Sequence, residues 1–172
     1  MNENKVSIRL ITEDDTNFVI KWRNNPRVRD NFIFRDKFTR DIHEKWLKEK
    51  VDRGLAIQYI ICAGDRCDPV GSVYFSNVDK DSAEYGIFIG EDSAVGRGIG
   101  TEAGKLLLRK GFERFGFKEI YLRVFKDNLS AIKSYEKLGF RTSETIKEVA
   151  CSNGEKRDMY LMIITRERYD QL

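Results

Sequence analysis

The chain is 172 residues long, with 41% hydrophobic and 34% charged residues and a formal net charge of only +3. This length suits a single domain, 1–172, that buries a sizeable core, and the balance of residues is typical of a soluble globular protein. The basic residues are scattered along the chain, so the sequence does not indicate a nucleic-acid partner. No apolar run approaches the ~20 residues that a membrane-spanning helix needs, so no membrane association is expected.

Cysteine and histidine are too few to build a metal site. Cys62, Cys67 and Cys151 form no C-x-x-C pair, and His43 is the single histidine. A zinc site would therefore lack ligands, and we expect no metal. Residues 1–5 lack the basic and apolar regions of a signal peptide, which predicts a cytoplasmic protein with reduced thiols. His43 stands among charged neighbours on a predicted helix, and we expect it at the surface.

The first part of the chain predicts one strand and two helices. Apolar and polar residues alternate over 6–10, which is the pattern of a half-buried strand. Thr12 and Asp15 have the spacing of a capping box, which opens a helix that Pro26 ends. A second helix is expected over 41–53, because its apolar residues recur at helical spacing.

A strand-rich segment follows. Residues 57–62 and 70–75 are predicted to be two strands joined by a turn, and 83–90 a third strand. Gly86 lies inside this third strand. A glycine in that position indicates a bulge or a place where another group approaches the backbone closely.

Residues 95–101 read Val-Gly-Arg-Gly-Ile-Gly-Thr and lead straight into a predicted helix. Glycines leave backbone N–H groups unshielded, and at a helix N-terminus such groups favour an anion, for example a pyrophosphate. A Walker A loop does not fit, because Ile99 stands where its first Gly belongs and Leu106 where Ser or Thr is required. A dinucleotide fingerprint needs an acidic residue closing the next strand, whereas Glu119 precedes that strand. Two interpretations of the glycine run remain: a binding loop for a nucleotide-bearing cofactor, or a turn that binds no ligand.

The last part of the chain adds three strands and a helix. A strand is predicted over 120–125. A short helix follows, with Asp127 or Asn128 as its N-cap and Gly139 at its end. A hairpin is predicted over 145–165, with its turn at an Asn-Gly pair. The complete order, β-α-α-β-β-β-α-β-α-β-β, predicts an α/β (α+β) domain with a mixed sheet. Ligands in such sheets bind at the carboxyl ends of strands, where neighbouring strands diverge. The glycine run lies at such an end.

Two motifs in this order resemble the GNAT superfamily of acetyl-CoA-dependent N-acyltransferases. The family's pyrophosphate loop, Q/R-x-x-G-x-G/A, is matched by Gly98 and Gly100, although Val95 departs from the usual Gln or Arg. Backbone N–H groups do most of the binding in such a loop, so the departure weakens the match without breaking it. Residues 128–140 match the family's N-x-x-A-x-x-x-Y-x-x-x-G-F stretch at every fixed position. The resemblance covers essentially the whole chain.

This resemblance implies a mostly antiparallel sheet of six to seven strands, flanked by helices and splayed between its fourth and fifth strands. In the family a bulge, for which Gly86 is the candidate, separates these strands, and the pantetheine of acetyl-CoA lies in the gap. Backbone groups of Phe88 and Ile89 would pair with pantetheine. The other cofactor-binding residues that the resemblance implies are Val95, Gly96, Arg97, Gly98, Ile99, Gly100, Thr101, Asn128 and Lys133.

The resemblance also implies two catalytic residues. Tyr135 matches the family's tyrosine, whose hydroxyl reaches the sulfur of coenzyme A. A phenol of reference pKa about 10 is protonated at neutral pH and can donate to a thiolate of pKa about 8.5. Glu84, on the strand before the glycine run, is the candidate general base, acting directly or through water. The alternatives are a core tyrosine and an exposed strand carboxylate.

The stretch Trp22-Arg23-Asn24, followed by a proline, is similar to the amino-sugar enzymes of pseudaminic acid biosynthesis. These enzymes share a branch of the family with ribosomal-protein and spermidine acetyltransferases. Trp22, Arg23 and Asn24 are therefore the candidate substrate-binding residues. In such an enzyme Arg23, Arg27 and Arg29 would bind a nucleotide phosphate, because arginine offers bidentate donors.

The expected function is transfer of an acetyl group from acetyl-CoA to the primary amine of a small molecule, a nucleotide-linked amino sugar, by a monomer or homodimer. A longer acyl donor stays open. The alternative acceptors are a protein N-terminus and a polyamine, although a polyamine calls for an acidic pocket. A non-catalytic module that senses acyl-CoA is also compatible with the sequence.

Overall fold

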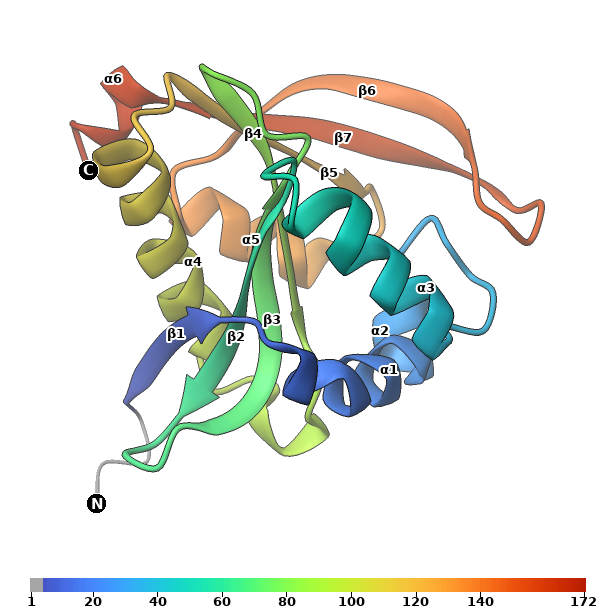
Figure 1. Ribbon diagram of the computed structural model, residues 1–172. Coiled ribbons are helices and arrows are strands. Elements are labelled where there is room, and N and C mark those ends of the chain that lie inside the picture. Colours follow the sequence, from blue (N-terminus) through green and yellow to red (C-terminus); the bar gives the residue numbers. More distant parts are fainter. Residues whose placement is uncertain (1–4) are drawn as a thin grey trace.

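The computed structural model describes residues 5–172, so residues 1–4, on which the signal-peptide prediction largely rests, lie outside the described part. The described residues form a seven-stranded sheet in the order β1-β2-β3-β4-β5-β7-β6, shown in Figure 1. Every neighbouring pair is antiparallel except β4 and β5, which are parallel. The predicted fold class is confirmed. The strands are β1 (Val6–Leu10), β2 (Ile57–Ala63), β3 (Asp68–Ser76), β4 (Ser82–Ile89), β5 (Glu119–Phe125), β6 (Arg141–Ala150) and β7 (Lys156–Thr165).

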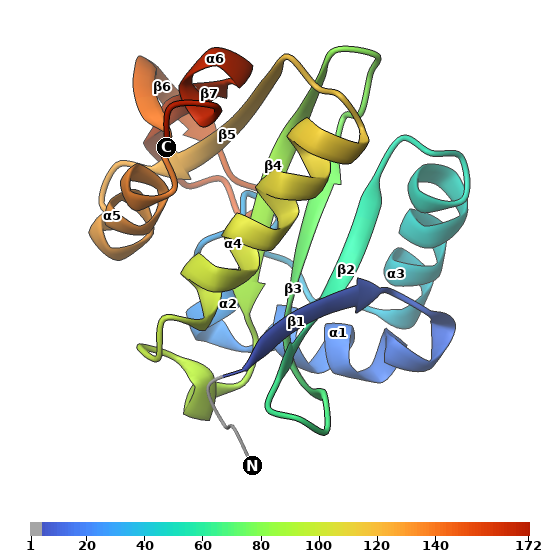
Figure 2. The same ribbon diagram turned by 90° about the vertical axis from the view of Figure 1, so that its left-hand side faces the viewer.

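Helices cover both faces of the sheet, with α4 on the face opposite to α1, α2 and α3 (Figures 1 and 2). The helix α5 packs beside α4. A π-helical turn prolongs α3 at Leu47–Val51 and another prolongs α4 at Lys110–Arg114, while short 3-10 turns occupy Glu13–Asp15 and Asp92–Ala94. The helices are α1 (Thr16–Asn24), α2 (Pro26–Arg29), α3 (Arg40–Trp46), α4 (Ile99–Arg109), α5 (Leu129–Lys137) and α6 (Arg166–Tyr169).

Strand alternation divides the core between the two faces. On β4, Ala83 and Tyr85 are buried in the large cluster beneath α4. Phe88 points to the other face, where it packs with Trp22 and Val19 of α1. Because side chains alternate along a strand, a single strand therefore supplies residues to both cores.

The parallel pair β4–β5 is joined along only part of its length. The strands pair from Ser82 to Glu84, where Glu84 lies opposite Tyr121, and no pairing with β5 continues over residues 85–89. On the other side of β4, the pairing with β3 continues to Ile89. The predicted separation of the fourth and fifth strands is therefore confirmed, and it exposes one edge of β4 beyond Glu84.

The predicted bulge at Gly86 is wrong, whereas the alternative of a close approach is confirmed. The register between β3 and β4 runs without a shift, with Gly86 directly opposite Tyr74. A Cβ atom added to Gly86 would lie 2.3 Å from the Tyr74 ring. Glycine is needed at this position because the tyrosine side chain crosses directly over the strand.

Local predictions for the first two helices hold with small changes. Asp15 accepts a hydrogen bond from the Thr12 backbone N–H at 2.9 Å, as in a capping box. Pro26 follows the end of α1 but also begins α2, since proline is well suited to the first helical position. The last hairpin starts earlier than predicted, because β6 begins at Arg141.

The prediction that all three cysteines are reduced thiols is wrong. Cys62 and Cys67 form a disulfide that spans the β2–β3 turn, with their Cα atoms 4.5 Å apart. The spacing of these residues matched no metal or redox motif, but the antiparallel hairpin brings its two sides together. Cys151 is free and buried.

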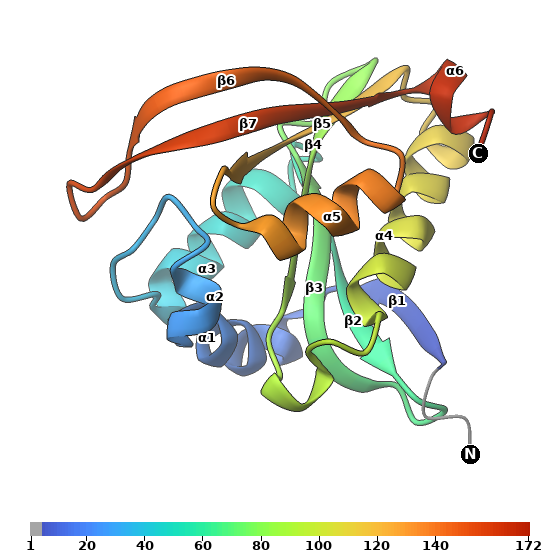
Figure 3. The ribbon, with the colours of Figure 1, turned by 180° about the vertical axis from the view of Figure 1, so that it is seen from behind.

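The β6–β7 hairpin reaches across the molecule to the segment between α2 and α3, as Figures 1 and 3 show. The Ser152 backbone N–H donates to the Ile33 carbonyl at 3.0 Å, and the Arg35 N–H donates to Ser152 Oγ at 2.7 Å. The hairpin tip thereby fixes the 30–39 segment, which lines one end of the candidate site.

Candidate active site

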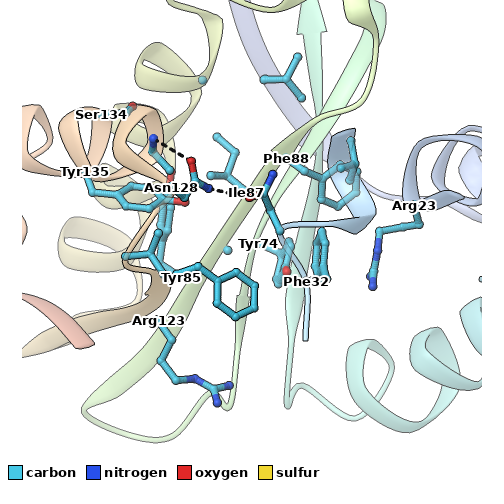
Figure 4. A pocket seen from close by; sticks show the side chains of 18 of the residues that line it. Arg23, Phe32, Tyr74, Tyr85, Ile87, Phe88, Arg123, Asn128, Ser134 and Tyr135 are labelled. Carbon is cyan, nitrogen blue, oxygen red and sulfur yellow. Dashed lines mark hydrogen bonds between the residues drawn. The ribbon is translucent and has the colours of Figure 1, made fainter. Parts of the chain in front are cut away.

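A cavity of about 990 Å³ opens where β4 and β5 separate. We call its two ends the glycine-loop side, lined by residues 94–96, residues 98–101 and α5, and the Arg23 side, lined by α1, α3, residues 31–34 and Phe38. Figure 4 shows Tyr135 and Asn128 at one end, Arg23 and Phe32 at the other, and Tyr74 between them. One continuous space thus connects the two sides.

The glycine run forms the start of α4. Gly96 and Gly98 have φ angles of +76° and +75°, in the left-handed region that favours glycine. Gly98 is the N-cap of α4, so the unpaired N–H groups of the first turn, from Ile99 to Thr101, lie beside the loop. An added Cβ would meet no atom within 4 Å at Gly96 or Gly98. The loop therefore presents open space next to the positive end of a helix, which suits a pyrophosphate.

The other loop residues differ in exposure. Val95 is 47% exposed, whereas Ile99 is 3% exposed and anchors the loop in the core. Gly100 lies over the side chains of Ile87 and Ile89, at 3.8 Å from each for an added Cβ. Arg97 is exposed and engaged with a neighbour.

The exposed edge of β4 carries unpaired backbone groups. The Gly90 N–H donates to the Val70 carbonyl on β3. Because successive peptide groups point to opposite sides of a strand, Phe88 faces β3 like Gly90, whereas Ile87 and Ile89 face the gap. The geometry therefore places Ile87 and the N–H of Ile89, but not Phe88, to offer backbone groups to a ligand in the gap, since the Ile89 carbonyl accepts from Arg27. Phe88 contributes a buried side chain, with its ring centroid 5.8 Å from that of Phe32.

Tyr135 projects from α5 into this space. Its ring makes edge contacts with Tyr85 and Phe140, at centroid distances of 5.8 and 6.1 Å. Its hydroxyl has no hydrogen-bond partner in residues 5–172 and lines the cavity. Burial, and to a lesser degree the neighbouring Tyr74, raises the pKa of Tyr135. The phenol is therefore a proton donor across the neutral and mildly alkaline range.

Two more predicted residues line the glycine-loop side. Asn128 caps α5 by accepting from the Ala131 N–H at 3.3 Å, and it donates to Asn31 Oδ1 at 3.0 Å. Lys133 is exposed at the mouth of the cavity. Thr101 and Ser134 join α4 to α5 through a hydroxyl contact of 3.0 Å.

Glu84 lies at the point where β4 and β5 separate. Its side chain is 12% exposed and lines the cavity. Arg123 Nε donates to its Oε1 at 2.7 Å, and Asn77 Nδ2 donates to its Oε2 at 2.7 Å. Both carboxylate oxygens of Glu84 are therefore engaged by neighbouring side chains.

Of the three predicted substrate-binding residues, only Arg23 lines the cavity. Trp22 is fully buried and donates its indole N–H to Glu91 at 2.7 Å. Asn24 holds the 30–39 segment by accepting from the Phe38 N–H and donating to the Phe38 carbonyl, each at 2.8 Å. Trp22 and Asn24 therefore support the residues that line the cavity without lining it themselves.

The neighbouring arginines are engaged elsewhere. Arg27 donates to Asp92 Oδ1 at 2.8 Å and to the Ile89 carbonyl at 2.9 Å, so it fixes the end of β4. Arg29 lies outside the cavity lining, 3.5 Å from Asp30. The predicted phosphate-binding group is thereby reduced to Arg23.

His43 is not at the surface, contrary to the prediction. It is 1% exposed and lines the cavity from α3. Its charged sequence neighbours were misleading, because a helix presents adjacent residues to different faces. Tyr74, whose phenol lies at the centre of the cavity, was also missed. Gly86, which lies opposite Tyr74 on β4, was the sequence signal for this close contact.

None of the helices formed within residues 5–172 has the length and apolar character that a membrane crossing requires. The same residues contain no group of three or more His, Cys, Asp or Glu side chains placed to hold a metal ion.

Comparisons with known proteins agree with this geometry. The family described as the acetyltransferase (GNAT) domain matches residues 5–141. The uncharacterized protein MJ1062 of Methanocaldococcus jannaschii is 31% identical over 149 residues; the match covers 85% of this chain but only 30% of that protein. The spermidine N(1)-acetyltransferase of Escherichia coli is 27% identical over 169 residues, covering 95% of this chain and 88% of that one.

A solved structure has the same fold. The spermidine N-acetyltransferase of Vibrio cholerae, crystallised in complex with CoA and spermine, superposes with a TM-score of 0.87 at 21% identity, covering 95% of this chain and 97% of the other. The family match spans most of the chain, and the topology and the separated β4–β5 pair are those of the family. The chain belongs to the GNAT family of acetyl-CoA-dependent N-acetyltransferases.

Proposed function

We propose that this protein transfers an acetyl group from acetyl-CoA to the primary amine of a small molecule that carries negative charge, such as a nucleotide-linked amino sugar. The observation that carries the proposal is the cavity between β4 and β5, which joins the glycine run to Tyr135 and to Arg23. The glycine-loop side fits CoA, because it offers helix N–H groups to a pyrophosphate and a free strand edge to pantetheine.

Bound acetyl-CoA supplies an activated thioester. The N–H groups of Gly96 to Thr101 would bind its pyrophosphate. The backbone groups of Ile87 and the N–H of Ile89 would orient its arm and polarise its carbonyl. Tyr135 holds a proton on its hydroxyl and donates it to the leaving sulfur. Asn128 holds the start of α5, and with it Tyr135, against the 30–39 segment.

Glu84 remains the proposed acceptor of the amine's proton, directly or through water. It pairs with Arg123, lines the cavity and lies where β4 leaves β5. The bonds from Arg123 and Asn77 fix the orientation of the carboxylate, and each oxygen keeps a second lone pair that can accept a proton.

The charge of the lining favours an anionic acceptor. Arg23, Arg123, Lys133 and Lys137 line the cavity, and Glu84 is the single carboxylate among its described lining residues. Since Arg123 balances Glu84, the remaining charge is positive. A polyamine, with several positive charges, would be repelled.

Polyamine acetylation is the second candidate, and it is favoured by one observation. The spermidine N(1)-acetyltransferase of Escherichia coli aligns with 95% of this chain at 27% identity. Acetylation of a protein N-terminus and acyl-CoA binding without catalysis are two further candidates, and neither is favoured by a specific contact. A monomeric or homodimeric state stays a prediction.

Thiol release from acetyl-CoA tests the proposal. The assay compares a UDP-linked amino sugar, glucosamine 6-phosphate, spermidine and a peptide with a free N-terminus. We expect the two phosphorylated amines to be acetylated fastest. Faster turnover of spermidine would establish the second candidate, and CoA binding without turnover of any amine would favour the non-catalytic module.

A further inference from the structure

Two polar side chains on the Arg23 side of the cavity lack partners. Nε of Arg23 and Nε2 of His43 are buried and have no hydrogen-bond partner in residues 5–172. Both residues line the cavity. Buried polar atoms without partners are rare in folded proteins because the lost hydration is not replaced. Such a pair indicates that a ligand provides the missing hydrogen-bond partners, an acceptor for Arg23 and, in the tautomer with hydrogen on Nε2, an acceptor for His43.

Arg23 is held rigidly for such a contact. Its guanidinium carbon lies 3.7 Å from the centroid of the Phe32 ring and 4.5 Å from that of Phe38. Stacking on these rings fixes the plane of the guanidinium and leaves its N–H edge available. The two Nη nitrogens also make no hydrogen bond in the described chain but are not buried, so they reach the open cavity.

No carboxylate of the described chain balances Arg23. Burial lowers the pKa of Arg23, and the nearby Tyr74 acts in the opposite direction. Every other arginine of the cavity wall has an acidic partner: Arg27 pairs with Asp92, and Arg123 pairs with Glu84. The missing counter-charge is therefore specific to Arg23.

His43 completes the site from α3. It is 1% exposed, and its ring centroid lies 6.2 Å from that of Phe38. Burial, and then the nearby Arg23, lowers the pKa of His43, so the imidazole is neutral at neutral pH and can donate one N–H. The neutral imidazole of His43 adds a hydrogen-bond donor beside the fixed positive charge of Arg23, and this combination favours binding of an anion.

The polar groups nearby on the same wall are satisfied. Trp46 donates to Gln58 Oε1 at 2.8 Å, and Gln58 donates to Ser72 Oγ at 2.9 Å. Ser72 in turn donates to the Tyr59 carbonyl at 2.9 Å. Two other buried groups of residues 5–172 lack a partner: Arg35 Nη2, whose residue does not line the cavity, and the hydroxyl of Tyr85, whose ring contacts Tyr135 on the glycine-loop side.

We propose that Arg23 and His43 form a binding site for an oxyanion, a phosphate or a carboxylate, carried by the acceptor amine at the end opposite to its amino group. This inference rests on the proposed function and assigns the acceptor's negative charge to one place. Guanidinium groups bind such oxyanions through two parallel N–H bonds. Tyr74 lies between Arg23 and Tyr135, so an anion at Arg23 would direct the other end of the acceptor past Tyr74 toward the acetyl group.

The test is calorimetric binding of UDP, inorganic phosphate and glucuronate to the protein in complex with CoA, without any amine. UDP and phosphate represent the phosphate source, and glucuronate represents the carboxylate source. Arg23→Gln should weaken the preferred probe by at least about tenfold, the usual effect of losing charge-assisted hydrogen bonds. His43→Phe keeps an aromatic ring beside Phe38 and should weaken it about threefold to tenfold.

Two further variants serve as controls. Arg23→Lys keeps the charge without the planar fork and should restore part of the affinity. Arg53→Gln removes an arginine that does not line the cavity, and it should leave probe binding unchanged. All variants should bind CoA like the wild type, which shows that they are folded.

Two results would overturn the inference. Either none of the three probes binds the CoA complex, or a probe binds equally well to wild type and Arg23→Gln while CoA binding is intact. Arg23 would then only hold Phe32 and Phe38 in place. Because the binding assay needs no turnover, it tests the anion site separately from the acetyl-transfer reaction. Probe binding at Arg23 can be found even if no amine is acetylated, and acetylation can be found even if no probe binds at Arg23.

Discussion

The glycine-loop side and the Arg23 side of the cavity are built in different ways. On the glycine-loop side, the chemistry resides in backbone N–H groups and in Tyr135, all within α4, α5 and one strand edge. On the Arg23 side, the chemistry resides in side chains of α1, α3 and β3, and the β6–β7 hairpin fixes the segment that covers them. Members of a family can therefore keep the backbone geometry of the glycine-loop side while side-chain substitutions change the Arg23 side.

This difference assigns different roles to the two sides. Backbone groups recognise what all members of the family bind, because their positions depend on the fold and little on side chains. The Arg23 side depends on individual side chains, and its positive charge distinguishes among acceptors. Changes on the glycine-loop side should therefore affect every acceptor alike, whereas changes on the Arg23 side should affect acceptors selectively.

The largest effect is expected from Tyr135→Phe, which removes the proposed proton donor without changing the ring. The turnover number should fall about 100-fold or more for every amine, as for loss of a general acid. Since burial raises the pKa of Tyr135, wild-type turnover should show no loss from ionisation of this tyrosine between neutral pH and its ordinary pKa of about 10. Steady-state thiol release over pH checks both points, and undiminished turnover in the variant would remove Tyr135 from the mechanism.

Glu84→Gln should give the next largest effect. An amide cannot accept the amine's proton, so turnover should fall about 10- to 100-fold for all acceptors. Arg123→Gln is the matched variant, because it frees the carboxylate from its partner at 2.7 Å but keeps the base. Arg123→Gln should lower turnover less than Glu84→Gln does in the same assay. Equal losses would mean that the pair serves only to hold β4 and β5 together.

Gly98→Val tests the loop. The left-handed φ of +75° strains any residue with a branched side chain, and α4 begins there. Affinity for CoA, measured by calorimetry, should fall about tenfold as the first-turn N–H groups move. Gly100→Ala is the control, because Gly100 does not need a positive φ and an added Cβ would have ordinary contacts at 3.8 Å. If both variants bind CoA alike, the loop conformation is not what holds the cofactor.

The sequence predicted the local geometry of the glycine-loop side, namely the loop before α4 and the helix that carries Tyr135, because these signals are local. Gly96, Gly98 and Tyr135 belong to short motifs whose spacing is set by one loop and one helix. His43 and Tyr74 were missed, because their surroundings come from strands and helices distant in sequence, and the glycine opposite Tyr74 was the single local sign of its contact. The Cys62–Cys67 disulfide is local, but the spacing of the pair matches no motif, and only the hairpin shows that its two sides meet.

The smallest effect is expected from Asp15→Asn, which tests the foundation of the Arg23 side. Asp15 is 2% exposed and accepts two bonds from Arg9, at 2.8 and 2.7 Å, beside the start of α1. Burial by itself would raise the pKa of Asp15, but the bonds from Arg9 and Thr12 prevail and lower it. The carboxylate therefore stabilises the fold above its unfolded pKa of about 3.9, and this contribution is lost as pH falls through its folded pKa.

The variant should lower the free energy of unfolding by about 1 kcal/mol at neutral pH, less than a fully buried pair because Arg9 is partly exposed. Urea denaturation at pH 7 and pH 3 measures the change. The loss should shrink at pH 3, and an equal loss at both values would show that the ion pair is not its cause. CoA binding at neutral pH should be unchanged, since Asp15 lies outside the cavity lining.

A crystal structure of the protein with CoA and UDP would test the central claim most directly. The account predicts the CoA pyrophosphate on the N–H groups of residues 96–101, the pantetheine along Ile87 and Ile89, the sulfur near the Tyr135 hydroxyl, and UDP phosphate oxygens on Arg23. It would be contradicted by CoA bound outside the β4–β5 gap, or by UDP phosphates that bind elsewhere and leave Arg23 and His43 without a partner.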